Sequence, residues 1–231
     1  MLKQTLITIL SGITVIGFAQ NKKNAGFNFK VDGEIKNYTK PYIYIHHKWD
    51  EVNITDSIKV VNGKFSKSFK SIDPNMYWFT TSTDINSQPN MPFFVDAGSV
   101  KATLKADSLP FSSITAGQTQ KDYIEYRSLV NTFVLKQQQM QTDFNNAQQA
   151  GDFKTAQGIQ QSYGELNNQF IGKLKEFIKT HNKSAVSGFI IYNDFNNPNI
   201  PFEVVNESLS YIDKSIADTK FIKLATKRVD A

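Results

Sequence analysis

The chain of 231 residues contains no cysteine. This absence excludes disulfide bonds, a dithiol redox centre, thiolate zinc sites, iron–sulfur clusters and a cysteine nucleophile within the chain. Excess charge of one sign is also small, because 26 Lys and Arg against 21 Asp and Glu give a net charge of +5. A nucleic-acid-binding domain usually carries a much denser basic patch, so we predict no nucleic-acid partner.

Several catalytic and cofactor motifs are missing as well. The sequence has no Gly-x-Gly, which excludes the usual dinucleotide fingerprint, and it lacks the Walker spacing. Neither Gly-x-Ser-x-Gly nor His-Glu-x-x-His occurs. We therefore predict that the protein is not an enzyme, with no catalytic residues, no cofactor and no metal site.

Residues 1–19 form a short apolar segment with a single charge, Lys3. The segment ends in Gly17-Phe18-Ala19, with small residues at both positions that a signal peptidase recognises. Its apolar run of about fourteen residues is short for a transmembrane helix, which needs about 20. We expect a signal peptide cleaved after Ala19 and a linker over 20–26. The mature protein is then predicted in the periplasm or outer cell envelope, without an integral membrane segment.

Residues 27–116 carry apolar side chains at every second position, with turn residues about every ten positions, which predicts antiparallel β-strands. The clearest element is a hairpin around Asn62-Gly63, a pair that tolerates positive φ. We also expect a turn at Asp32-Gly33 and a second hairpin closed by Ala97-Gly98. Further strands are expected over 42–46, 76–81, 92–96 and 100–104. These elements predict an all-β domain, either a sandwich or an open barrel.

Residues 117–231 show helical periodicity instead, with apolar residues spaced three and four apart. Two long stripes flank Ala150-Gly151-Asp152, in which the glycine can end one helix and the aspartate can begin the next. Two long helices joined by so short a turn must form an antiparallel hairpin. Shorter helices are expected after Ser184, after Pro201 and around Phe221. The predicted fold class is therefore α+β, with a β domain followed by a helical domain.

A series of short motifs resembles a known domain. They are Phe29-Lys-Val-Asp-Gly33-Glu-Ile35, Thr55-Asp56-Ser57, Val61-Asn62-Gly63-Lys64-Phe65, Pro74-Asn-Met-Tyr77 and Pro92-Phe-Phe-Val-Asp-Ala-Gly98. Together they resemble an N-terminal β domain of unknown function in exported Gram-negative proteins, generally found ahead of a thioredoxin-like domain of the thiol-disulfide interchange kind. The segment Phe177-Ile-Lys-Thr-His-Asn-Lys-Ser184 resembles the helical segment that those proteins place between the two domains.

This resemblance implies a place among the envelope thiol-disulfide systems but no activity, because the redox cysteines of such proteins lie in the thioredoxin-like domain. Three functions stay open. The first is an exported, non-catalytic accessory or binding module that contacts a protein partner in the cell envelope. The second is a truncated thiol-disulfide oxidoreductase that lacks its thioredoxin domain. The third is a carbohydrate-binding β protein.

Four side chains are candidates for a functional surface. Trp49 and Trp78 could stack on a sugar ring or on an unfolded client, although aromatic residues in a small sheet commonly pack in its core. His46 lies at a predicted strand end beside His47, but adjacent side chains of a strand point to opposite faces, which argues against a shared metal ion. Asp96 is the first candidate for a catalytic carboxylate, and a turn residue is the structural alternative.

Overall fold

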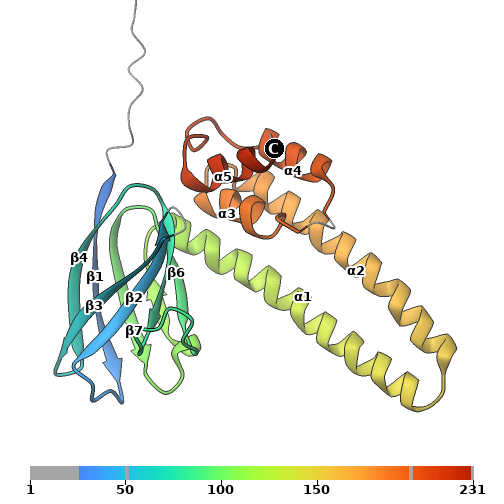
Figure 1. Ribbon diagram of the computed structural model, residues 1–231, viewed down its shortest axis with the longest axis horizontal. Helices are drawn as coiled ribbons and strands as arrows, with labels where there is room; N and C mark the ends of the chain where they lie inside the picture. The colour runs from blue at the N-terminus through green and yellow to red at the C-terminus, as the bar shows by residue number, and fades with distance from the viewer. Residues whose placement is uncertain (1–25, 50–51, 198–199, 230–231) are drawn as a thin grey trace, which may run out of the picture.

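The computed structural model describes residues 26–49, 52–197 and 200–229, which form a curled β-sheet followed by helices (Figure 1). The α+β fold class predicted from the sequence is confirmed. The predicted signal peptide over residues 1–19 lies outside the described residues, as does the linker up to its last residue, Gly26. Cleavage after Ala19 and export therefore stay predictions.

Eight strands form one sheet that curls into a nearly closed barrel (Figure 1). The strands are β1 Phe27–Lys36, β2 Tyr42–Trp49, β3 Val52–Val61, β4 Lys64–Ser71, β5 Asn75–Thr80, β6 Met91–Val95, β7 Gly98–Lys105 and β8 Ser113–Thr115. Their order across the sheet is β6-β5-β2-β3-β4-β1-β7-β8. Of the two architectures that the alternating pattern predicted, the open barrel is the one observed.

Turns were predicted at two glycines of the barrel, and only one of these predictions is correct. Asn62 and Gly63 have φ values of 51° and 72°, and they close the β3–β4 hairpin as predicted. The turn expected at Asp32-Gly33 is wrong, since β1 continues through both residues. A Cβ on Gly33 would clash with the backbone oxygen of Ala102 and lie 2.5 Å from the Phe65 ring. This glycine is therefore needed for close packing inside the sheet and not for a turn.

The predicted hairpin of β6 with β7 is also wrong, although both strands exist. β6 pairs with β5, and β7 pairs in parallel with β1, so the sheet is not wholly antiparallel. Alternating side chains indicate that a segment is a strand, but they do not specify its partner. Here β7 extends the sheet beside β1, the first strand of the chain, while β6 lies at the opposite edge next to β5.

Two long helices follow the barrel. α1 Gln118–Gln149 and α2 Phe153–Thr180 form the predicted antiparallel hairpin. Gly151 adopts a φ of 70° in the connection, and the Asp152 carboxylate accepts a hydrogen bond from the Thr155 backbone N–H at 3.0 Å. The cap residues read from the sequence are thus the ones that end one helix and begin the other.

Three short helices, α3 Ala185–Asn193, α4 Phe202–Ser210 and α5 Lys220–Val229, pack around the base of the hairpin. Their core includes Phe94 of β6, which is fully buried, and the partly buried Met76 of β5 packs against this core. The ring centroid of Phe94 lies 5.1 Å from that of Tyr123 in α1 and 5.5 Å from that of Phe189 in α3. Phe94 therefore anchors the helical base on the barrel, and the hairpin projects from this base into solvent (Figure 1).

Among the described residues, no helix combines the length and the apolar character needed to cross a bilayer.

Candidate functional site

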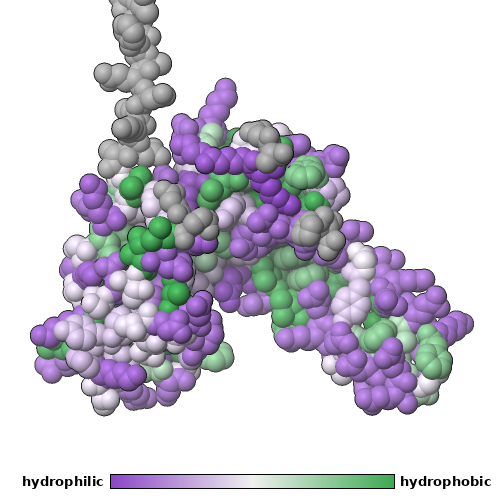
Figure 2. Space-filling model, in the orientation of Figure 1, coloured by the Kyte–Doolittle hydropathy of each residue, from purple (hydrophilic) through white to green (hydrophobic). Residues whose placement is uncertain are grey.

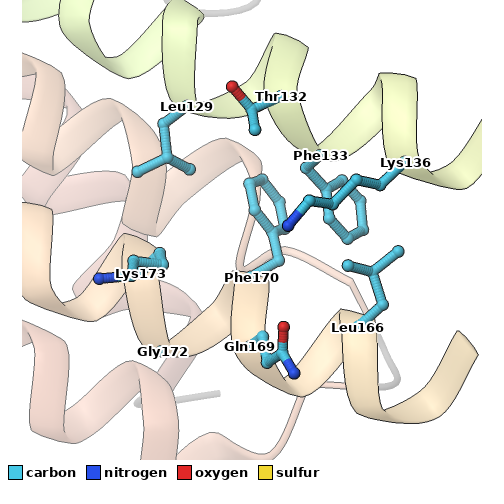
Figure 3. A pocket seen from close by; sticks show the side chains of 9 residues that line it. All are labelled: Leu129, Thr132, Phe133, Lys136, Leu166, Gln169, Phe170, Gly172 and Lys173. Carbon is cyan, nitrogen blue, oxygen red and sulfur yellow. The ribbon is translucent and has the colours of Figure 1, made fainter. Parts of the chain in front are cut away.

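An open groove of about 590 Å³ lies between α1 and α2 (Figure 3). Leu129 and Phe133 of α1 face Leu166 and Phe170 of α2 across it. The Phe133 and Phe170 rings stack with their centroids 4.0 Å apart and their planes 12° from parallel. We call the surface formed by these four apolar residues the hairpin groove.

The rim of the hairpin groove is polar and positively charged. Lys136 lies on the α1 side and Lys173 on the α2 side, with Thr132 and Gln169 as neutral neighbours. No aspartate or glutamate lines the groove, although Lys173 donates to Glu176 of its own helix at 2.9 Å. An apolar floor between two ammonium groups suits a ligand that is apolar on one side and negatively charged at its margins.

The groove exists because two helices cannot enclose the stripe that each presents. Residues spaced four apart lie on the same side of a helix, as Leu129 and Phe133 do. Within 127–146 of α1 and 157–173 of α2, no residue is fully buried. Figure 2 shows apolar surface on the hairpin beside its base and again near its far end, among mostly hydrophilic surface.

Sequence reasoning identified the two apolar stripes but missed the groove. Phe133 and Phe170 belong to these stripes, but their spacing alone does not show that the two rings meet in an open groove. The length of the two stripes could have indicated the groove. The sequence contains no third apolar stripe long enough to cover two helices of this length.

The predicted surface residue His46 is fully buried, which corrects that prediction. β2 continues past it to Trp49, and the connection after β5 covers its ring. Nδ1 lies 2.8 Å from the Thr55 hydroxyl, while Nε2 lies 2.8 Å from the Thr80 hydroxyl and 3.1 Å from the Ser82 carbonyl. A neutral ring that donates from Nε2 and accepts at Nδ1 satisfies these partners, and burial holds the pKa of His46 below its usual value.

The neighbouring His47 points to the opposite face, into the barrel, where its ring lies 4.9 Å from that of Tyr77. Burial lowers the pKa of His47 as well. The described residues contain no cluster of three or more His, Asp or Glu side chains able to hold a metal ion. Asp50 and Glu51, which follow the histidines in sequence, lie outside the described residues.

The two tryptophans occupy different surroundings. Trp49 is partly buried, and the Lys220 ammonium of α5 lies 5.1 Å from its ring centroid, so this tryptophan takes part in the contact between barrel and helices. Trp78 is also partly buried, with its indole N–H donating to the Ile85 carbonyl at 3.4 Å. It lines a separate hollow of about 300 Å³ on the outer face of the barrel.

Asp96 forms a link between the barrel and α1. One carboxylate oxygen accepts a hydrogen bond from the Ala97 N–H at 2.8 Å, and the other accepts from the Thr119 hydroxyl at 2.7 Å and the Thr119 N–H at 3.3 Å. A Cβ on Gly117 would lie 2.5 Å from this carboxylate. The carboxylate thus caps the first turn of α1 from a residue distant in sequence.

No curated protein matches the chain. Residues 29–123 match a family described as "Domain of unknown function (DUF4369)", a region that comprises the barrel and the first residues of α1. At this level the resemblance to an N-terminal domain of unknown function is confirmed, whereas the relation to thiol-disulfide proteins stays a prediction.

Proposed function

We propose that the protein is a non-catalytic accessory module of the cell envelope, and that its hairpin groove binds an amphipathic helix of a partner protein. The groove carries the proposal, since its apolar floor at Phe133 and Phe170 is open to solvent although the hairpin could bury it against one more helix. Recognition of a helix in a groove uses apolar anchors spaced three and four apart. Such a partner would complete a three-helix arrangement.

The lysines at the rim define the chemistry of the partner. Lys136 and Lys173 flank the apolar floor, so acidic residues beside the apolar stripe of a docking helix would meet opposite charge on both sides. The exported location and a thiol-disulfide oxidoreductase as partner are supported by the apparent signal peptide and by the motif resemblance. We propose that the module binds such an enzyme and positions it.

Cross-linking from a single site tests this function. Because the chain has no cysteine, Thr132→Cys provides a single thiol at the groove rim. A photoreactive group is attached to this thiol in the purified protein, which is then added to an envelope fraction and irradiated. We expect one discrete adduct, and its mass spectrum should identify a protein segment with an acidic, amphipathic helical pattern. The adduct should disappear when Phe170→Asp is added to the same variant.

Gln138→Cys supplies the matched control, because Gln138 is exposed on α1 and does not line the groove. The same adducts from both positions, or no adduct from Thr132→Cys, would contradict the proposal. An adduct between two copies of this chain would contradict a separate partner protein and would show instead that the groove mediates self-association.

A further inference from the structure

Two hollows on the outer face of the barrel border the same stretch of chain. The larger, of about 510 Å³, lies between the β5–β6 connection, β6 and the first turns of α1. The smaller, of about 300 Å³, is the one that contains Trp78. Both are lined by Gln88, Asn90 and Pro92, so the two hollows are neighbours. Neither includes any residue of the hairpin groove.

The smaller hollow combines an aromatic wall with side-chain amides. Trp78 lies beside Pro92, its partner in the β5–β6 register, and its indole is held by the hydrogen bond to the Ile85 carbonyl. Asn86 and Gln88 line the same hollow. A flat apolar ring next to groups that both donate and accept hydrogen bonds matches a sugar, whose ring has an apolar C–H face and peripheral hydroxyls.

The larger hollow supplies a single charge. Arg127 is its only charged lining residue, and no aspartate or glutamate lines it. The guanidinium lies 5.9 Å from the Tyr123 ring centroid and donates to the Tyr123 hydroxyl at 3.3 Å. None of the ion pairs observed among the described residues includes Arg127. A guanidinium braced by a tyrosine and without a carboxylate is suited to a carboxylate on a ligand.

The edge of the sheet at this point disfavours the other common ligand, an extended peptide. β6 is the edge strand, but Pro92 has no N–H, and the Phe94 N–H already donates to the Gln120 side chain at 2.8 Å. A peptide that adds to a sheet edge needs these backbone donors. The side-chain amides and the aromatic wall remain available, and these are the groups that a saccharide uses.

We infer that the paired hollows bind an acidic saccharide, with a sugar ring on Trp78 and a carboxylate on Arg127. This site is separate from the hairpin groove and goes beyond the proposed function. It would give the module a second ligand, a carboxylate-bearing glycan, held at the junction of barrel and hairpin.

Calorimetric titration of the full chain tests the inference with oligomers of galacturonate, glucuronate and N-acetylmuramate, each beside its neutral counterpart. We expect at least one acidic oligomer to bind more tightly than its neutral form. Arg127→Gln should weaken the acidic oligomer about ten-fold or more, as expected for a lost charged hydrogen bond, and leave the neutral one unchanged. Trp78→Ala should weaken both.

Two controls keep this experiment decisive. Trp78→Phe retains an aromatic ring and should keep most of the binding, so a loss seen only in Trp78→Ala cannot be assigned to misfolding once circular dichroism of both variants agrees. Lys154→Gln removes one exposed positive charge that lines neither the hollows nor the hairpin groove, and it should leave saccharide binding unchanged. Absence of binding by every acidic oligomer, or an equal loss in Lys154→Gln, would overturn the inference. So would binding of a carboxylate-ended peptide that acidic sugars fail to displace.

Discussion

The barrel and the helical hairpin bury their apolar side chains to very different extents. Ile43, Ile45 and Phe79 inside the barrel are 0% exposed, whereas Leu135 and Phe153 of the hairpin are 65% and 75% exposed. A curled sheet encloses its own inner face, but two helices cover only one side of each other. The barrel thus provides its own core, and the hairpin leaves apolar surface that another molecule can cover.

Removal of a buried ring from the barrel should have the largest effect. We expect Phe79→Ala to lower the free energy of unfolding by about 3–5 kcal/mol, because its ring packs between those of Phe65 and Phe93. Phe133→Ala, whose ring is only partly buried in the hairpin groove, should cost less than about 2 kcal/mol. Urea titrations followed by circular dichroism measure both. Equal losses would show that the hairpin is as tightly packed as the barrel.

Substitution of glycine by alanine should change the stability of the protein in opposite directions in the two regions. Gly33→Ala places a Cβ against the backbone of Ala102 and the Phe65 ring, which should destabilise the protein by about 1–3 kcal/mol. Gly158 and Gly164 lie inside α2, and apart from the backbone of their own helix no atom lies within 4 Å of an added Cβ. Alanine at either should stabilise by about 0.5–1 kcal/mol. Thermal unfolding measures the signs, and destabilisation by both kinds of change would contradict the difference in packing.

Asp96 tests how firmly barrel and hairpin are joined. Asp96→Ala removes the acceptor for the Thr119 N–H and hydroxyl, and it should destabilise the protein by about 1–2 kcal/mol. Asp96→Asn retains an acceptor oxygen and should recover most of this loss. Amide hydrogen exchange in the first turn of α1 should rise in Asp96→Ala alone. Unchanged exchange there would mean that Asp96 does not determine where the helix begins.

The smallest expected effect is a dependence on pH that originates in the barrel. Because the pKa of His46 is lower in the folded state than in the unfolded chain, the unfolded state binds more protons as the pH falls. Stability is therefore greatest above the unfolded pKa of about 6.5 and should decrease from pH 7 to pH 6 by less than about 1 kcal/mol for this histidine. His47 adds a change of the same sign.

Denaturant titrations at both pH values check the direction of this change. His46→Gln should reduce the dependence, since glutamine cannot take up a proton, and His181→Gln in the helical base is the matched substitution elsewhere. A larger reduction from His181→Gln would place the dependence in the helices.

Features that depend on neighbouring residues were predictable from the sequence. The hairpin at Asn62-Gly63 needs only two residues that accept positive φ, and the Gly151 and Asp152 caps need only local backbone geometry. The prediction that β6 pairs with β7 was wrong, because β7 pairs with β1, a strand more than sixty residues earlier in the chain. The turn expected at Gly33 failed because the contact that requires a glycine comes from β4 and β7.

The candidate sites were less accessible to sequence reasoning for the same reason. His46 was placed at the surface, but side chains from β3 and β5 surround its ring. Trp78 was recognised as a candidate, whereas the arginine and amides near it belong to other elements of the chain. Arg127 becomes relevant only because Phe94 anchors the start of α1 next to β6.

By itself, the amino-acid sequence determined which chemistry is impossible here and which elements form. The lack of cysteine removes thiol chemistry from these 231 residues, and the change of apolar spacing from two to three and four distinguishes strands from helices. The tertiary structure decided which strands pair, which glycine is sterically required and where the grooves lie. These features depend on contacts between distant residues, and a periodic pattern fixes the faces of an element without fixing the neighbours that those faces meet.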